Sequence, residues 1–530
     1  MLAKDPTARS VPDRAELERW IGAVVIPSLR PPGGLAPGAT VRAPSQAYLE
    51  RFPPVCVIGF GRRLSDGATI PGLPAAIADL RARAVRPFAV ACDLERGAGY
   101  HVPGRTALPP VRALAEACGP GAVHPLGVDP QLLAPVEEAA LLTGLEARAE
   151  GIELVLAPVL DVNSNPRNPI IGARAFGTSP HAVANLGRAF LRGLARAGVG
   201  ASLKHFPGHG DTHVDSHLAL PRVQRRVERD DEEADAGART SEQEGGGPEF
   251  LEQSLADLDS AEGMHALEGV ELLPFREVLD APEAAALGDA LTVMVAHLDV
   301  PDLTGEPGLA TTLAPATGRW LADAGFEGAV LTDGLEMLAV ADEPDLGMRA
   351  LLAGCHGLLG PRDEAALATD LLAAVEAGRL DPAVLKEAAG RMERLASALL
   401  APPLIAPVAP ALDPVELTLR ALRAQPHARA FAGRFLGAAL TGDATLIAQV
   451  GPLPGGEAKA GSSPKLLVAG PRTPLPTPLP GGPVLWFGPP ETVPKALRSR
   501  PYLWAWAADP VVAQALGRFL SEPQDPQGPA

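Results

Sequence analysis

The densest group of reactive side chains lies in the segment Lys204–His217, which reads KHFPGHGDTHVDSH. It contains four of the eleven histidines, one of the six lysines and two aspartates. The histidines are four residues apart, which on a helix would form one metal-binding face, but Pro207, Gly208 and Gly210 exclude that helix. A zinc or iron site formed by a folded loop remains an open interpretation. Purely structural histidines do not account for this density at a predicted strand end.

A second candidate is Asp333, which follows the apolar run Ala329–Thr332 and precedes a glycine and a predicted helix start. A carboxylate at the carboxyl end of a barrel strand is placed for catalysis, and it could equally cap the following helix. Asp93, Lys204 and His205 occupy the same kind of position at the ends of other apolar runs. Polar groups that converge from several strand ends are what an active site in a barrel needs.

The few asparagines are unevenly used. Only four occur in 530 residues, and three of them lie in Asp161–Pro169, the sequence DVNSNPRNP, directly after an apolar run. Two interpretations are equally open. Asn163, Asn165 and Asn168 build turns with the neighbouring prolines, or they shape a loop of an active site.

Short apolar runs separated by amphipathic segments must supply these strand ends. The eight runs are Ala23–Pro27, Val55–Gly59, Phe88–Cys92, Leu154–Val159, Ala201–His205, Val293–His297, Ala329–Thr332 and Gly357–Leu359. Segments such as Pro180–Ala197, which follows the suitable N-cap residue Ser179, Leu313–Ala324 and Asp363–Ala377 have helical spacing of apolar residues. This alternation predicts an α/β fold with a parallel sheet, and eight units predict a (β/α)8 TIM-type barrel. An open doubly wound sheet is the alternative, although no Gly-x-Gly-x-x-Gly turn follows the first run.

The predicted barrel spans residues 1–400 and contains an acidic insertion at about 224–264. Between Glu228 and Glu262 there are 13 Asp and Glu residues against two Arg. Such a charge excess, with three consecutive glycines inside it, indicates a solvated segment. We therefore assign the insertion no role in the chemistry.

The amino-acid composition changes after residue 400. Residues 401–414 hold five prolines and are typical of a linker. For residues 415–530 we predict a small α/β unit or a poorly ordered region. Its strand-like runs are Lys465–Ala469 and Val484–Phe487, and a terminal helix is predicted near Val511–Leu520.

Composition and charge narrow the class of protein. The net charge of −17 argues against nucleic acid or anionic membranes as partners. No apolar run approaches the roughly 18 residues of a membrane span, and the charged N-terminus lacks the apolar core of a secretory signal. The four cysteines have neither disulfide density nor metal-site spacing. We therefore expect a cytoplasmic protein, and a monomer.

Three motifs together resemble glycoside hydrolase family 3, in its bacterial β-N-acetylglucosaminidase (β-hexosaminidase) branch. They are the loop Asp161–Gly177 (DVNSNPRNPIIGARAFG), the segment Lys204–His217 and the strand end Thr332–Met337 (TDGLEM), in the order of that branch. The resemblance extends over roughly residues 20–400. It implies a retaining exo-hydrolase that removes terminal β-linked N-acetylhexosamine from a small carbohydrate, such as a cell-wall muropeptide fragment.

The resemblance also implies catalytic roles. Asp333 matches the nucleophile that forms a covalent glycosyl-enzyme, His217 matches the acid/base, and Asp215 matches its partner. Retaining hydrolysis needs a nucleophile on one face of the anomeric carbon and a proton donor near the leaving oxygen. A histidine with an ordinary pKa of about 6.5 can give and take back a proton near neutral pH, and a carboxylate beside it can orient the ring. No metal or organic cofactor is implied.

The resemblance places Asp93, Arg174, Lys204 and His205 against the hydroxyl groups of the sugar. The sequence departs from the branch at His101, which stands where a sugar-binding arginine is usual. It departs again in the acidic insertion. The C-terminal region is shorter than the second domain of two-domain members, so no catalytic residue is assigned to it.

Several alternatives remain. A phosphorylase would use phosphate in place of water at the same site. A β-glucosidase of the family usually takes its acid/base from a second domain, so the Asp215–His217 pair argues against it. From other classes, the chain could be a non-catalytic sugar-binding protein or a metal-dependent hydrolase that uses the histidine cluster.

Overall fold

The computed structural model describes residues 12–29, 43–61, 72–119, 130–214, 216, 219–223, 264, 267–401, 412–423, 439–442, 465–469, 484–487, 502–505 and 510–521. Asp215 and His217 lie outside these residues, as do most of the predicted acidic insertion and most of the predicted linker. Within the described residues, no helix has the length and apolarity needed to cross a bilayer.

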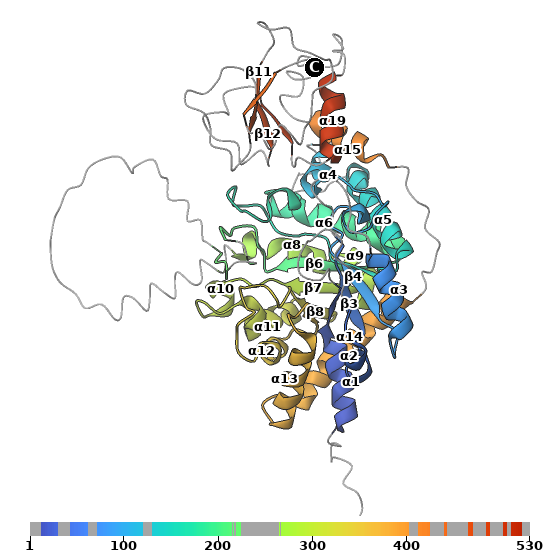
Figure 1. Cartoon of the computed structure of the whole chain (residues 1–530). Coiled ribbons are helices and arrows are strands. Elements are labelled where there is room, and N and C mark those ends of the chain that lie inside the picture. Colours follow the sequence, from blue (N-terminus) through green and yellow to red (C-terminus); the bar gives the residue numbers. More distant parts are fainter. Residues whose placement is uncertain are drawn as a thin grey trace, which may run out of the picture.

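A curled parallel sheet of seven strands forms the centre of the larger part of the described chain (Figure 1). The strands are hydrogen-bonded in their order along the sequence: β2 (Ser28–Leu29), β3 (Cys56–Gly59), β4 (Ala89–Cys92), β5 (Leu154–Val155), β6 (Gly200–Phe206), β7 (Leu291–Val295) and β8 (Ala329–Thr332). Every residue of β3 to β8 is buried. A parallel strand buried on both faces reads as a continuous apolar run, which is why the sequence shows runs and not alternation.

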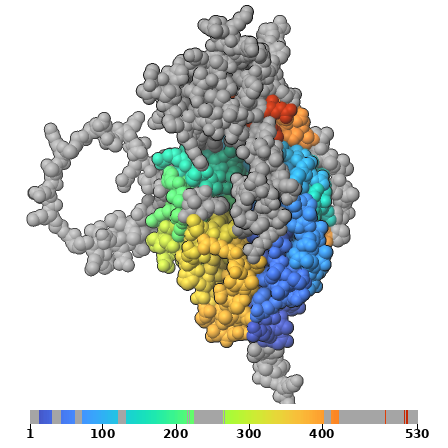
Figure 2. All heavy atoms as spheres, viewed as in Figure 1, coloured from blue at the N-terminus to red at the C-terminus, as the bar shows by residue number. Residues whose placement is uncertain are grey.

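The first and last predicted strands also pair. Strand β1 (Val25–Ile26), just before β2, pairs in parallel with β9 (Leu358–Leu359), and an isolated parallel bridge joins Leu331 of β8 to Gly357. Each of the eight predicted apolar runs therefore overlaps a strand. At the surface, Figure 2 shows the blue N-terminal segment beside the orange-yellow segment around residues 364–376, and residues 14–24 contact that segment. The predicted α/β class and parallel sheet are confirmed.

Helices surround this sheet (Figure 1). They are α1 (Arg14–Val24), α2 (Gln46–Arg51), α3 (Leu73–Arg83), α4 (Val111–Ala117), α5 (Ala134–Ala149), α6 (Pro180–Ala197), α8 (Leu273–Leu279), α9 (Pro282–Leu287), α10 (Pro301–Thr304), α11 (Pro315–Asp323), α12 (Leu346–Leu352), α13 (Glu364–Glu376) and α14 (Pro382–Leu400).

The sequence explains the bounds and packing of α6. Ser179 accepts a hydrogen bond from the N–H of Ala182, as an N-cap residue does, and Gly198 ends the helix in a left-handed conformation. The helix packs closely on α5, because a Cβ at Gly193 would lie 2.2 Å from the carbonyl oxygen of Glu137. The predicted helix and its cap are both confirmed.

A second parallel sheet follows in the sequence, in the order β10 (Ala439–Gly442), β11 (Lys465–Ala469), β12 (Val484–Phe487) and β13 (Tyr502–Ala505). Helix α15 (Pro414–Arg423) contacts both α4 and α19 (Pro510–Ser521), as Figure 1 shows. The two predicted strands and the terminal helix are present, whereas β10 and β13 were not predicted. The domain boundaries near residues 400 and 414 remain predictions.

Candidate active site

A cavity of about 450 Å³ lies at the carboxyl ends of the sheet strands. Its lining includes Asp93 after β4, Arg174 in the loop after β5, Lys204 and His205 of β6, and Asp333 after β8. The structure thus brings together all five predicted site residues that it describes. Parallel strands present their carboxyl ends at one edge of a sheet, and this places such residues in one cavity.

The predicted acid/base pair cannot be placed in the same way. Asp215 and His217 lie outside the described residues. The residue between them in the sequence, Ser216, is buried and lines the cavity.

Asp333 is the first residue after β8. Its N–H donates to the carbonyl oxygen of Val295 at 2.8 Å, and its Oδ1 accepts from the N–H of Gly334 at 2.7 Å. Burial alone would raise the pKa of Asp333, but interactions with His205 and His297 and the Gly334 N–H outweigh it, so this pKa lies below its usual range. The carboxylate is therefore ionised at neutral pH, which is the form that a nucleophile needs.

The helix predicted to start directly after Asp333 is wrong. Residues 335–345 contain no helix, and α12 begins at Leu346 with Asp345 as its N-cap residue. The N–H of Leu335 donates instead to the carbonyl oxygen of Leu359 in β9, at 2.8 Å. This tertiary hydrogen bond takes up the Leu335 N–H, and residues 335–342 form turns, so Asp333 does not cap a helix.

A cluster of charges forms one side of the cavity. Lys204 is 1% exposed, and its Nζ lies 2.7 Å from Asp93 Oδ1 and 2.8 Å from Glu95 Oε1. Arg174 makes a two-bond pair with Glu95, with Nε to Oε2 at 2.9 Å and Nη2 to Oε1 at 2.6 Å. Burial lowers the pKa of Lys204, but Asp93 and Glu95 raise it more, so the group stays an ammonium.

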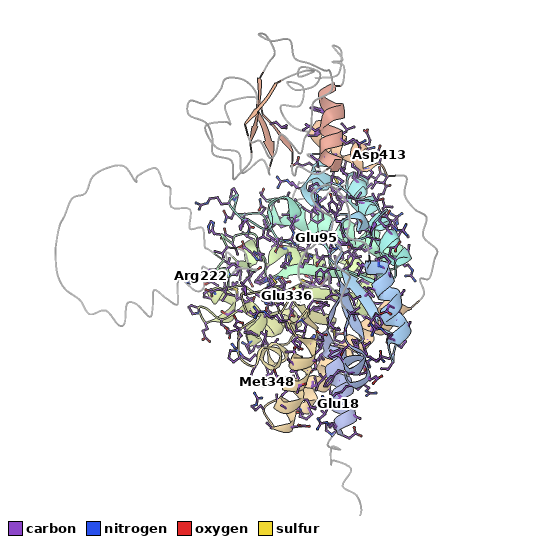
Figure 3. All side chains as sticks on the ribbon, in the orientation of Figure 1. Glu18, Glu95, Arg222, Glu336, Met348 and Asp413 are labelled. Atoms are coloured by element: carbon purple, nitrogen blue, oxygen red, sulfur yellow. The ribbon has the colours of Figure 1, made fainter. Side chains whose placement is uncertain are left out.

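Glu95 was not predicted as a site residue. Burial raises its pKa, yet Arg174 and Lys204 hold it well below its usual range. The sequence carried one signal, because Glu95 stands two residues after Asp93 at the same strand end. Figure 3 labels Glu95 and Glu336, and both line the cavity.

Asp161 was also missed as a functional residue. It is fully buried and accepts from the N–H of His209 at 2.7 Å and of His205 at 3.3 Å, and its Oδ2 lies 2.6 Å from His205 Nδ1. On the other side of the ring, Arg174 Nη2 lies 3.3 Å from His205 Nε2. These contacts on two sides of the ring hold His205 in one orientation at the cavity.

The asparagine loop serves both purposes considered from the sequence. Asn165 and Asn168 use their Oδ1 atoms to accept from main-chain N–H groups of their own loop. Asn168 Nδ2 donates to the carbonyl oxygens of His209 at 2.8 Å and Gly210 at 3.0 Å, and Asn165 Nδ2 donates to that of Thr212 at 3.0 Å. The loop therefore builds turns and also holds the segment after β6.

The histidines of this segment have separate partners. His205 contacts Asp161, His209 contacts Thr212 and Ser216, and His213 contacts Asn165. Strand β6 runs through Phe206, so the helical stripe is not formed, as the glycines and proline indicate. Within the described ranges, no group of three or more His, Cys, Asp or Glu side chains is arranged to hold a metal ion.

His297 is a further residue that the sequence did not single out. It is fully buried, with Nδ1 at 2.7 Å from Thr312 Oγ1 and Nε2 at 3.1 Å from the carbonyl oxygen of Gly334. Because Gly334 directly follows Asp333, this contact fixes the main chain that carries the candidate nucleophile.

The strand ends of this α/β protein surround a cavity that holds an ionised carboxylate and paired cations. This is the arrangement found in sugar hydrolases that depend on a carboxylate. The family described as Glycosyl hydrolase family 3 N terminal domain matches residues 54–234 and 256–395. A beta-hexosaminidase of Xylella fastidiosa (strain 9a5c) is 31% identical over 364 residues, which are 67% of this chain and 89% of that protein. The chain belongs to glycoside hydrolase family 3, and the expectation from the three motifs is confirmed.

Solved structures share the fold. A glycoside hydrolase family 3 beta-N-acetylglucosaminidase from Paenibacillus sp. str. FPU-7 superposes with a TM-score of 0.65 at 24% identity, over 95% of this chain and 96% of that one. Beta-glucoside phosphorylase BglX gives a TM-score of 0.65 at 16% identity, over 97% and 92%. The interruption of the family match, residues 235–255, falls within the predicted acidic insertion.

Proposed function

We propose that the protein is a retaining exo-β-N-acetylglucosaminidase that hydrolyses terminal β-linked N-acetylhexosamine. The observation that carries the proposal is an ionised, fixed Asp333 in the same cavity as Lys204, Arg174 and His205. Relatives named beta-hexosaminidase over two thirds of the chain support the choice of sugar.

The proposed reaction has two steps. The Asp333 carboxylate, whose Oδ1 accepts from the Gly334 N–H, attacks the anomeric carbon while the glycosidic C–O bond breaks and His217 gives its proton to the leaving oxygen. Water then attacks the same carbon, His217 takes back a proton, and the bond to Asp333 breaks. Asp215 orients the imidazole and stabilises its cationic form.

The charges around the cavity suit a neutral sugar. Lys204 and Arg174 carry positive charges that Asp93 and Glu95 balance at distances below 3 Å. This side of the cavity therefore offers hydrogen-bond donors without a net charge, which favours hydroxyl and acetamido oxygens over an anionic substrate. Arg174 and Lys204 are the proposed donors, and Asp93 is the proposed acceptor for hydroxyl hydrogens.

We propose further that the sheet closes into a (β/α)8 barrel. The β1–β9 pairing and the bridge from Leu331 to Gly357 support closure, with β1 and β2 acting as one strand. A cytoplasmic location is proposed from the cysteine usage, and muropeptide fragments as the natural substrate are proposed on the strength of the motif resemblance.

Hydrolysis of 4-nitrophenyl β-N-acetylglucosaminide, measured beside the β-glucoside for wild type and Asp333→Ala, tests this function. We expect turnover of the acetamido sugar alone, and its loss in the variant with folding retained.

Turnover in Asp333→Ala would place the nucleophile elsewhere, and preference for the glucoside would indicate a β-glucosidase. Sugar 1-phosphate formed only with added phosphate would indicate a phosphorylase, and loss of activity on exhaustive chelation a metal-dependent hydrolase. No turnover of either substrate would favour a sugar-binding protein.

A further inference from the structure

We propose that His209 and Ser216 are positioning residues that hold the acid/base pair at the cavity through a hydrogen bond between them. The inference rests on the proposed function, because it takes Asp215 and His217 as the acid/base pair. Ser216 is the neighbour of both in the sequence, so an interaction that fixes Ser216 acts on both of them at once.

The contact lies in the wall of the cavity. His209 is 2% exposed and Ser216 is 3% exposed, and both line the cavity that contains Asp333. His209 Nε2 lies 3.2 Å from Ser216 Oγ, which is hydrogen-bond distance. The bond joins two residues that are seven positions apart in the segment after β6.

The hydrogens available on the neighbouring groups determine which partner donates in the bond between His209 and Ser216. Thr212 Oγ1 donates to the carbonyl oxygen of His209 at 3.1 Å and accepts from Asn168 Nδ2 at 3.2 Å. A hydroxyl has one hydrogen, so His209 Nδ1, at 2.8 Å, must donate to Thr212 Oγ1. Burial lowers the pKa of His209, so its ring is neutral. Nε2 is therefore an acceptor, and the Ser216 hydroxyl donates to it.

His209 is itself held at three points. Its N–H donates to Asp161 Oδ1 at 2.7 Å, and its carbonyl oxygen accepts from Asn168 Nδ2 at 2.8 Å. The third point is its ring, at Thr212 Oγ1. Asp161 and Asn168 belong to the loop after β5, so His209 joins Ser216 to the loop that follows another strand of the sheet. A ring fixed in this way can fix Ser216 within the tolerance that proton transfer requires.

The test compares two substrates that differ in their need for an acid. We take the ratio of kcat/KM for 4-nitrophenyl β-N-acetylglucosaminide, with a good leaving group, to that for the disaccharide N,N′-diacetylchitobiose, with a poor one. The variants are Ser216→Ala, His209→Asn and the double variant. Asn is chosen because its amide can still donate to Thr212 while the Nε2 acceptor is removed. His217→Ala serves as the reference for loss of the acid.

General acid catalysis raises a reaction rate about 10²- to 10⁴-fold. We therefore expect the ratio of kcat/KM values to rise most in His217→Ala, and to rise about tenfold or more in Ser216→Ala and His209→Asn. The double variant is expected to exceed neither single variant, because both remove the same bond. Ser202→Ala is the matched control: Ser202 is buried on β6, and its hydroxyl has no hydrogen-bond partner among the described residues. Its ratio should equal that of wild type.

Three outcomes overturn the inference. The ratio could stay at the wild-type value in Ser216→Ala and His209→Asn while it rises in His217→Ala. The effects of the two variants could multiply in the double variant. Ser202→Ala could also change the ratio as much as Ser216→Ala. By contrast, an unchanged ratio in His217→Ala would remove the proposed acid role itself, so the two failures are distinguishable.

Discussion

The groups around the buried carboxyl of Glu271 shift its pKa, and the shift sets how much this residue changes the free energy of unfolding with pH. Its side chain is 7% exposed and packs behind Gly208, where an added Cβ would lie 2.8 Å from the Cβ of Glu271. Burial raises the pKa of Glu271 most, the Asp211 carboxylate raises it further, and a hydrogen bond with the main chain lowers it only in part. The pKa is about 7 as a result.

Glu271→Gln replaces this carboxyl by a neutral group of nearly the same shape. In wild type the folded state binds the proton more tightly than the unfolded state, so the free energy of unfolding falls as pH rises from about 4.5 to about 7. At 1.36 kcal/mol per pH unit, the loss approaches about 3 kcal/mol above pH 8. Because glutamine does not ionise, the variant should be more stable than wild type by up to about 3 kcal/mol at pH 8, and by much less near pH 5.

Urea unfolding at pH 5 and pH 8 measures this difference. Glu268→Gln is the matched control, because the Glu268 side chain is 39% exposed and pairs with Arg276 at 3.1 Å. An exposed pair contributes about 1 kcal/mol or less, so the control should differ little from wild type at either pH. A Glu271→Gln protein that is no more stable at pH 8, or equally stabilised at both pH values, would refute the reasoning.

Three further predictions concern the site and the insertion. Glu95→Gln removes the carboxylate shared by the buried Lys204 and the half-buried Arg174, so we expect a loss of about 2–4 kcal/mol in urea unfolding and a higher KM, with the exposed Asp79→Asn as a near-neutral control. An effect no larger than that of Asp79→Asn would contradict the role of Glu95. Asn168→Ala removes hydrogen bonds to the segment after β6 but no cavity-lining group, so kcat should fall more than KM rises in steady-state assays. Unchanged kcat would argue against the loop as a support. Deletion of residues 228–262 should leave kcat/KM nearly unchanged, whereas a large loss would show that the insertion shapes the site.

The strands could be located from the sequence because of how they are buried. Strands such as β4 and β7 are covered on both faces, so each one appears as an apolar run bounded by polar residues. The residue after such a run lies at the carboxyl edge of the sheet, and this rule alone finds Asp93 and Asp333. The family motifs added Arg174, whose loop carries no apolar signal.

The partners of these residues could not be found in the same way. Lys204 and Asp93 are 111 residues apart in the sequence, and His205 and Asp161 are 44 apart. Periodicity reports only which face of an element is buried, so it does not say which carboxylate meets which cation. The helix expected after Asp333 failed for a related reason, because a hydrogen bond from Leu335 to β9 overrides the local preference.

The buried carboxylates show how this fold separates protonation states within a small region. Glu95 and Asp161 face cations, imidazole rings or main-chain N–H groups, and their pKa values lie below the usual range despite burial. Asp333 is in the same condition. Glu271, on the other side of the segment after β6, faces Asp211 and keeps its proton up to a pH of about 7. The difference follows from the groups that lie near each carboxyl. His205, His297 and the Gly334 N–H keep Asp333 ionised, whereas the Asp211 carboxylate and burial keep Glu271 neutral at the same pH.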